Sequence, residues 1–186
     1  MSKQNLWISF LPIWIVVNIL GCISFGMINA MPYFAFLPII GGSIVLGLLQ
    51  WGALQKPLGI DWTWMLTSIV ANIGLFIACD IQWSSSIWFL IELLGSLALL
   101  GIFQWFVLKD FLYHANKWIY LSPLSALIGR LLSSIIISGL NALSVSWLSF
   151  IFWLSYGVVY GAFSGISLIV LINLPKPKGL EARWSL

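Results

Sequence analysis

Arg130 is the residue of this chain whose position has the clearest chemical consequence. It lies about eleven residues into an apolar stretch from Ile119 to Leu140, near the middle of a segment long enough to cross a bilayer. A charged side chain at that depth costs at least ~2.5–3.5 kcal/mol and normally faces a partner or a water-filled cavity. The expected partner is Glu92, on an apolar stretch that enters from the opposite side, and Asp80 is the second candidate.

Asn18 and Asn72 are expected at a similar depth on two further apolar stretches. Arg130, Glu92 and the two asparagines would then share one level of the protein. Two interpretations of this level stay open. One is a buried ion pair with two amides that fixes the order of the helices, and the other is a pocket for an anionic or polar small molecule. A proton relay is less favoured because it needs a longer chain of titrating groups.

Catalytic and metal-binding patterns do not occur in the sequence. It has no Ser/His/Asp set, HExxH motif, paired intramembrane carboxylates or phosphate-binding glycine loop. His114 is the only histidine, and Cys22 and Cys79 form no CxxC motif, so no metal site is predicted. The two cysteines are interpreted as small residues packed between helices. The chain is therefore not expected to be an enzyme.

The composition predicts that these polar residues are positioned by membrane-spanning helices. The 186 residues are 61% hydrophobic and 7% charged, whereas roughly a quarter of a soluble domain is charged. Six apolar stretches are long enough to span a bilayer: Leu6–Ile28, Tyr33–Leu54, Trp62–Asp80, Ile87–Leu108, Ile119–Leu140 and Val145–Ile172. This pattern predicts an all-α integral membrane protein with one six-helix domain, residues 1–174, and a tail, residues 175–186.

The basic residues predict how this bundle is oriented. If the six helices alternate in direction, one side of the membrane receives seven of the eight Lys and Arg residues: Lys3, Lys56, Lys109, Lys117, Lys176, Lys178 and Arg183. The positive-inside rule then places both termini in the cytoplasm, or on the equivalent side of an internal membrane. The net charge of +3 is interpreted as topology, so the expected partner is the lipid bilayer and not nucleic acid.

Tryptophans are expected to mark the two membrane boundaries, because amphipathic indoles favour the headgroup level. Trp62, Trp64 and Trp118 are among those assigned to the cytoplasmic boundary, and Trp147 is assigned to the opposite one.

The even-numbered helices share a pattern that predicts three helical hairpins descended from one. Gly47 to Leu54 reads GLLQWGAL, Gly101 to Leu108 reads GIFQWFVL, and Gly161 begins a weaker copy. Gln50, Trp51, Gln104 and Trp105 are expected to contact other helices or the membrane interface. The small residues Gly157, Gly161 and Gly165 form a ridge that is expected to let another helix approach closely.

These segments resemble a group of small, largely uncharacterised polytopic membrane proteins that are frequent in cyanobacteria. The matching pattern is Gly-x-x-Gln-x-x-x-Leu, a basic residue soon after it, and a Trp that opens the next helix: Gly47, Gln50, Leu54, Lys56 and Trp64, then Gly101, Gln104, Leu108, Lys109 and Trp118. The chain departs from the pattern at Ser164, where Gln is expected. The resemblance implies a photosynthetic bacterium's membrane as the setting, its inner membrane or a thylakoid membrane, and implies no activity.

Two classes of function follow as hypotheses. The first is a non-catalytic accessory or scaffold subunit of a larger membrane complex, photosynthetic or electron-transferring, whose partners are other integral membrane proteins. Chlorophyll, carotenoid or lipid at its periphery are open candidates, and no bound cofactor is required by the sequence. The alternative is the substrate-binding membrane subunit of a vitamin-type transporter, with its polar site around Arg130.

Overall fold

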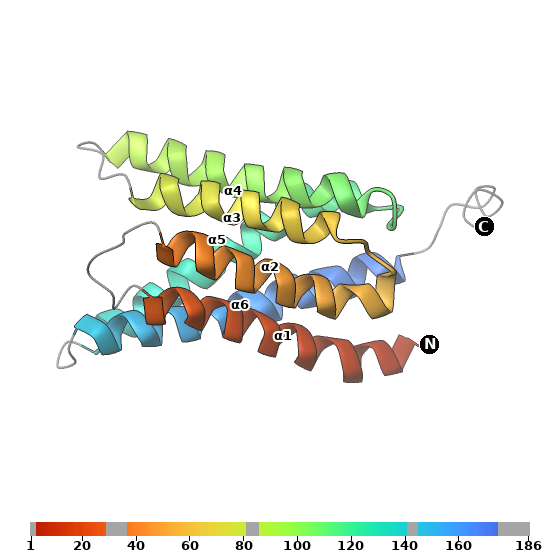
Figure 1. Cartoon of the computed structure of the whole chain (residues 1–186), viewed down its shortest axis with the longest axis horizontal. Coiled ribbons are helices and arrows are strands. Elements are labelled where there is room, and N and C mark those ends of the chain that lie inside the picture. Colours follow the sequence, from red (N-terminus) through yellow and green to blue (C-terminus); the bar gives the residue numbers. More distant parts are fainter. Residues whose placement is uncertain (1–2, 29–36, 81–85, 141–144, 175–186) are drawn as a thin grey trace.

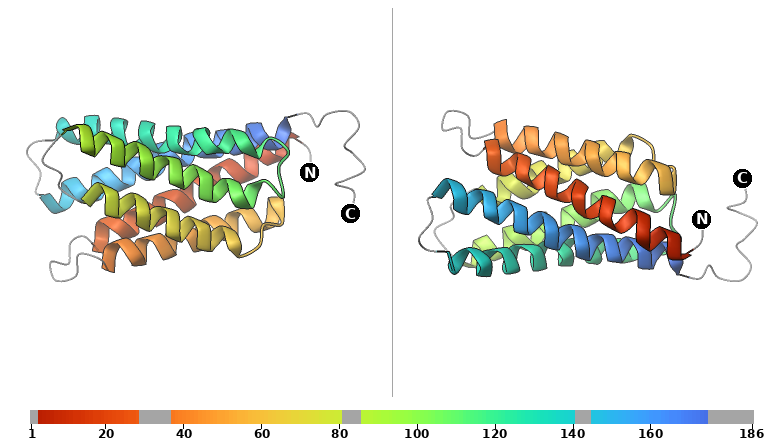
Figure 2. Two further views of the ribbon diagram at one scale, coloured as in Figure 1. Left: turned by 90° about the horizontal axis from the view of Figure 1, so that it is seen from above. Right: turned by 90° about the horizontal axis from the view of Figure 1, so that it is seen from below.

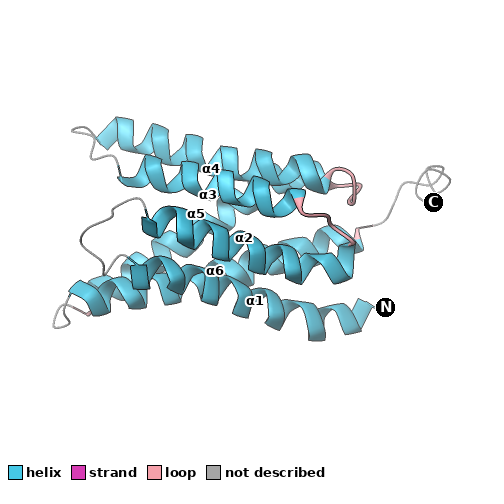
Figure 3. Ribbon diagram, in the orientation of Figure 1, coloured by secondary structure: helices cyan, strands magenta, loops and turns pink. Residues whose placement is uncertain are grey.

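The computed structural model describes residues 3–28, 37–80, 86–140 and 145–174. Side chains are described for residues 9–25, 40–74, 95, 97–140 and 147–174. The described residues form helices and connecting turns and contain no strand, so the predicted all-helical fold is confirmed (Figure 3).

Each of the six predicted apolar stretches is a helix. The helices are α1 (Lys3–Ile28), α2 (Leu37–Leu58), α3 (Thr63–Asp80), α4 (Ser86–Leu108), α5 (Trp118–Ser138) and α6 (Val145–Asn173). Their ends differ from the predicted ones by four residues at most. A short 3₁₀ helix, η1 (Ala115–Lys117), leads directly into α5 and was not expected.

The end of α2 lies four residues beyond the predicted end at Leu54. A proline lacks the backbone N–H and is unfavourable inside a helix. The helix nevertheless includes Pro57 in its last turn and ends at Leu58. Gly59 follows with φ of 67°, and its N–H donates to the Gln55 carbonyl at 2.8 Å. A glycine in this left-handed conformation is a common helix terminator, so Gly59 and not Pro57 sets the end.

The six helices form a closed ring. Each helix packs against the helices before and after it in the sequence, and α6 returns to pack against α1 (Figures 1 and 2). The start of α1, the end of α6 and the α2–α3 and α4–α5 connections lie at the same end of the ring. We call this the basic end, because Lys56, Lys109 and Lys117 lie there.

Length and composition identify two described segments that could each cross a membrane, Ala115–Ser138 and Trp147–Asn173. Two shorter described segments, Ser9–Phe25 and Leu97–Leu108, are also apolar. This finding gives weak support for a membrane location, because core helices of soluble proteins pass the same test.

Candidate functional site

Three tryptophans on the odd-numbered helices point into the ring. Trp14 on α1, Trp64 on α3 and Trp118 on α5 are all completely buried. The sequence interpretation assigned Trp64 and Trp118 to a belt at the cytoplasmic membrane boundary, and the structure buries both side chains among the helices. For Trp118 the physical reason is that an indole can also be satisfied inside a bundle when its N–H finds an acceptor there. Trp118 Nε1 donates to Gln104 Oε1 at 2.8 Å, and Trp14 Nε1 donates to Ser164 Oγ at 2.9 Å.

A buried polar residue follows each of these tryptophans by four positions. These residues are Asn18, Ser68 and Ser122, and each has no exposed surface. Residues four apart lie one above the other on the same face of a helix, so each polar side chain faces the interior one turn beyond its tryptophan.

The even-numbered helices supply the partners of these side chains. Gln50 Nε2 donates to Asn18 Oδ1 at 2.9 Å, which joins α2 to α1. Gln104 Nε2 donates to Ser68 Oγ at 3.4 Å, a long contact that joins α4 to α3. Ser122 Oγ donates to Gln104 Oε1 at 2.9 Å, so Gln104 connects α3, α4 and α5.

We call this set of buried side chains the polar layer: Trp14, Asn18, Gln50, Trp64, Ser68, Gln104, Trp118, Ser122 and Ser164. Tyr160 on α6 completes it, because its buried side chain lies close to Ser122, Gln104 and Gln50. Ser164 Oγ also donates to the Tyr160 carbonyl at 2.6 Å within α6. All six helices contribute to this layer, which therefore connects the whole ring.

Two atoms of the polar layer lack a partner among the described residues. The Trp64 indole N–H is a buried donor, and Gln50 Oε1 is a buried acceptor. The two residues stand in the same relation along the chain as Trp118 and Gln104, which do bond to each other. A hydrogen bond from Trp64 Nε1 to Gln50 Oε1 would satisfy both atoms and complete the set of three tryptophan bonds.

Beside the polar layer, glycines on the even-numbered helices allow each of these helices to approach the next odd-numbered helix closely. A Cβ atom added at Gly47 would lie 3.0 Å from the Met65 carbonyl oxygen, and one at Gly161 would lie 3.0 Å from Ile15 Cα. A Cβ at Gly101 would collide with the Ile119 carbonyl. Each of these three contacted residues directly follows one of the buried tryptophans.

Gly157 and Gly165 extend this close approach along α6. A Cβ at Gly157 would lie 2.7 Å from Ile19 Cα, and one at Gly165 would lie 2.7 Å from Trp14 Cδ1. The ridge that the sequence singles out therefore lies against α1.

The structure describes the side chains of three residues that the sequence grouped around Arg130, namely Asn18, Asn72 and Arg130 itself. Asn18 bonds to Gln50 and donates to the Trp14 carbonyl at 2.7 Å, so it belongs to the polar layer. Asn72 donates to the Ser68 carbonyl at 2.7 Å, one turn beyond the layer. Arg130 is half-buried on α5, directly after Gly129, which packs against the Tyr156 ring. The side chains of Glu92 and Asp80 lie outside the described residues, and their pairing with Arg130 stays a prediction.

A small cavity lies beside the polar layer. It has a volume of about 10 Å³, and Cys22, Asn72 and Tyr160 are among its lining residues. That volume is about what one water molecule requires. Cys22 is a free, buried thiol, and the side chain of Cys79 lies outside the described residues.

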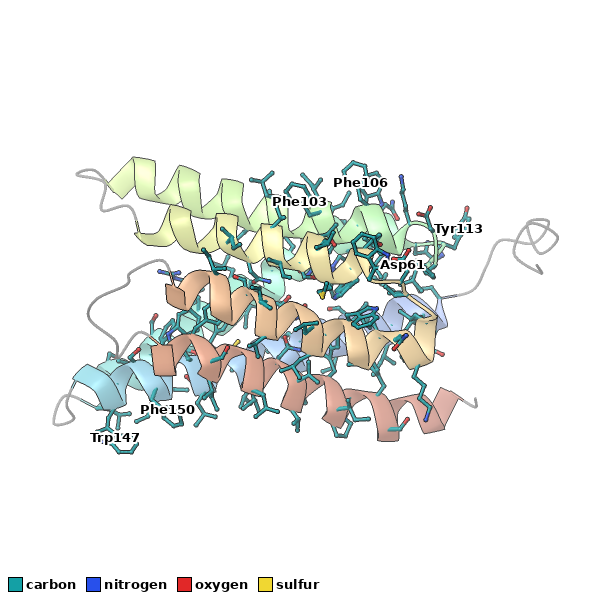
Figure 4. All side chains as sticks on the ribbon, in the orientation of Figure 1. Asp61, Phe103, Phe106, Tyr113, Trp147 and Phe150 are labelled. Atoms are coloured by element: carbon teal, nitrogen blue, oxygen red, sulfur yellow. The ribbon has the colours of Figure 1, made fainter. Side chains whose placement is uncertain are left out.

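The basic end carries the exposed charges of the described residues. Lys56, Asp61, Lys109 and Asp110 are exposed there. Lys109 Nζ lies 5.8 Å from the Trp105 ring centroid and 5.1 Å from that of Phe106. Figure 4 shows Asp61 and Tyr113 at this end, with Trp147 and Phe150 at the opposite end.

Two further predicted positions lie near the basic end. Trp51 is half-buried and donates its indole N–H to the Ile60 carbonyl at 3.2 Å. His114 is half-buried and stacks edge-on against Tyr113, with 4.8 Å between the ring centroids. No group of three or more His, Cys, Asp or Glu side chains that could hold a metal ion occurs among the described residues.

Comparisons of the chain with protein-family models, with curated proteins and with solved structures found no match.

Several residues of the polar layer were not selected by the sequence reasoning, namely Trp14, Ser68, Ser122 and Tyr160. The sequence contains a signal for three of them. In the first and third apolar stretches, and at the start of the fifth, a tryptophan is followed four residues later by a polar residue. Tyr160 has no such signal, because it occupies the place of Leu46 and Leu100 in the even-numbered helices.

Proposed function

We propose that the chain is a six-span membrane protein whose interior contains the polar layer and whose outer surface faces lipid. The support is that polar side chains are buried in the interior while many large apolar side chains are exposed on the outer surface. Gln50, Gln104 and Asn18 are buried, while Ile135 is 66% exposed and Leu131 56% exposed. A soluble monomer rarely exposes contiguous apolar surface on this scale. In lipid the same arrangement is favourable, because polar side chains bond across helices and apolar ones meet hydrocarbon.

Helix lengths and charges support the same proposal. The six helices contain 26, 22, 18, 23, 21 and 29 residues, against about 20 needed to span hydrocarbon. Lys56, Lys109 and Lys117 lie together at the basic end. The positive-inside rule then places this end and the start of α1 in the cytoplasm.

We further infer that the three hairpins α1–α2, α3–α4 and α5–α6 are copies of one unit. Support comes from the polar layer, in which each hairpin contributes a buried tryptophan, a polar residue four positions later, and Gln50, Gln104 or Ser164 from its second helix. The glycine contacts repeat in the same order around the ring. Ser164 differs from the two glutamines, and the larger Tyr160 side chain occupies part of the space beside it.

For its biochemical role we propose a non-catalytic accessory or scaffold subunit of a larger membrane complex. The observation that carries this proposal is that the described polar groups of the interior bond mainly to one another, and that the cavity beside them has a volume of about 10 Å³. The outer surface is left to carry the function. It includes an apolar groove of about 380 Å³ between α4 and α5, in which Tyr120 and Leu124 lie. The resemblance to cyanobacterial proteins favours a photosynthetic or electron-transfer complex as the partner.

Gentle extraction from the native membrane tests this role. The chain should migrate with a larger complex on a native gel, and mass spectrometry of that band should identify a constant set of integral membrane proteins. A photo-crosslinking residue at Leu124 should capture one of them, whereas the same residue at Leu20, exposed on α1, serves as the control. Migration as an isolated chain, with lipid as the only crosslinked species at both positions, would contradict the proposal.

A transporter-type binding subunit is the second candidate, because Arg130 places a half-buried cation within an apolar segment. An anionic or polar small molecule would then stabilise the isolated chain against heat. Arg130→Ala should abolish that stabilisation. If no small molecule stabilises the chain, the transporter role is contradicted and the scaffold role remains.

A further inference from the structure

The outer surface of the ring carries a groove between α1 and α2 at the basic end. Its volume is about 240 Å³. The lining residues are Ser9, Phe10, Ile13, Gly52, Ala53, Lys56 and Pro57. The walls are almost entirely apolar, and the one charged residue among them is Lys56, which is exposed. The groove therefore combines an apolar trough with a cation close to the proposed membrane boundary.

The groove exists because α2 has a glycine where the other two even-numbered helices have large apolar side chains. Gly52 lies two residues after Gln50, and a Cβ atom added there would meet nothing within 4 Å. The corresponding residues are Phe106, two after Gln104, and Ile166, two after Ser164. Phe106 is 49% exposed and Ile166 41% exposed, so both project from the outer surface. Figure 4 shows Phe106 on the outer side of α4 towards the basic end.

The lysine that follows the glutamine has different surroundings in the α1–α2 and α3–α4 hairpins. Lys109 Nζ lies over the Trp105 and Phe106 rings, so its ammonium group already has an aromatic contact on its own helix. On α2 the residue equivalent to Phe106 is Gly52, so Lys56 has no aromatic ring at that position. The first hairpin thus presents a lysine beside an open apolar groove, whereas the lysine of the second hairpin lies over aromatic rings.

We propose that this groove binds one anionic glycerophospholipid, with part of an acyl chain along Gly52 and Ile13 and the phosphate beside Lys56. The inference rests on the membrane location proposed above and not on the accessory role. Charge complementarity selects an anionic headgroup over a zwitterionic one, because a lysine near a membrane surface attracts an anionic lipid by about 1 kcal/mol. The volume is below the ~300–1,000 Å³ of sites that enclose a whole drug-sized ligand. It suits a single chain lying along the surface.

The test uses the purified full-length chain in a mild detergent. Native mass spectrometry would count retained phosphatidylglycerol and phosphatidylcholine with identical acyl chains, and thermal unfolding would be followed with each lipid and with inorganic phosphate alone. We expect one phosphatidylglycerol to be retained and to raise the unfolding temperature, with phosphatidylcholine weaker by about fivefold and phosphate without effect. Equal retention of the two lipids, or stabilisation by phosphate alone, would overturn the assignment.

Two variants and a control locate the site. Gly52→Phe copies the residue of the second hairpin and should weaken phosphatidylglycerol retention by about tenfold or more, because the apolar trough is filled. Lys56→Gln should remove the preference for the anionic lipid while leaving weak retention of both. Lys109→Gln keeps the groove intact and should change neither. Retention by Gly52→Phe at the level of the unchanged chain would refute the proposal.

Failure of the lipid-site proposal can be distinguished from failure of the accessory-subunit proposal. Gel filtration would establish that Gly52→Phe is folded, which the open space around Gly52 favours. A chain found outside the membrane fraction of cells would remove the premise of the lipid site, whereas a membrane-bound chain without partners would remove only the accessory role.

Discussion

Among the described residues of the polar layer, Gln104 makes the most hydrogen bonds to other helices, so its loss should affect the fold most. Its carbonyl accepts from Trp118 and Ser122, and its amide donates to Ser68. Buried groups that lose their partners cost more than the bonds themselves contribute, because they also forgo bonds to water. The side chain therefore connects three helices through one amide.

Gln104→Leu tests this role at the scale of one residue. The substitution keeps the volume roughly constant and leaves the Trp118 indole and the Ser122 hydroxyl without their acceptor. We expect a loss of about 1–3 kcal/mol in the free energy of unfolding, since interhelical bonds in membranes contribute ~0.6–2 kcal/mol each. Denaturant titration of the purified chain measures it. Gln55→Leu on the exposed side of α2 is the matched control and should change stability little.

Trp64 provides a second test at this scale. If Trp64 Nε1 pairs with Gln50 Oε1 in the membrane, Trp64→Phe and Trp118→Phe should lower stability by similar amounts, about 1 kcal/mol each, because each removes one indole donor. If Trp64 stays unpaired, Trp64→Phe should be neutral or stabilising. The comparison of the two variants by thermal unfolding decides between these states, and a neutral Trp118→Phe would contradict its bond to Gln104.

At the scale of helices, the contact between α1 and α6 depends on glycine. A Cβ atom at Gly157 would lie 2.9 Å from the Asn18 carbonyl oxygen as well as close to Ile19 Cα, and backbone atoms cannot rotate away. Gly157→Ala should therefore separate the two helices despite the better helix propensity of alanine. We expect a lower unfolding temperature, corresponding to about 1–3 kcal/mol.

Gly74→Ala is the control for this prediction. A Cβ at Gly74 on α3 would meet nothing within 4 Å, so the substitution should be neutral or stabilising by up to ~1 kcal/mol. Equal effects of Gly157→Ala and Gly74→Ala would indicate that α6 does not pack on α1 as described.

The helices themselves are readily predicted from this sequence, and their inward faces are not. Apolar runs interrupted by Pro, Gly, Asn and Lys give the helix ends to within four residues, with Gly59 the clearest correction. Hydrophobicity does not distinguish the buried Trp64 from the 56% exposed Trp62, because almost every position on these helices is apolar. The polar residues Gln50, Gln104 and Ser122 carry the directional information, and only their bonds across helices identify the inward face.

The residues that the sequence grouped around Arg130 show that depth along a helix does not specify which neighbour a side chain contacts. Asn18 and Arg130 were placed together because both lie near the middle of their helices, and this grouping stays a prediction. Asn18 turns towards Gln50.

At the scale of the whole molecule, the arrangement predicts a defined topology in the membrane. Single cysteines at Lys56 and Lys109 should react with a membrane-impermeant thiol reagent only when it is added from the cytoplasmic side. A cysteine at Trp147, which is 62% exposed at the opposite end, should react from the other side. The background for these variants replaces Cys22 and Cys79 by Ala. Labelling of Lys56→Cys and Lys109→Cys from opposite sides would rule out the six-span arrangement.

The contact of α6 with α1 also means that the order of the hairpins in the gene is only one of several that could make this ring. The first residues of α1 and the last residues of α6 lie at the same end, where the α2–α3 turn also lies. A circularly permuted chain, joined by a short flexible linker there and opened next to Asp61, would begin with α3 and end with α2. We expect it to reach the membrane and to unfold near the temperature of the unpermuted chain.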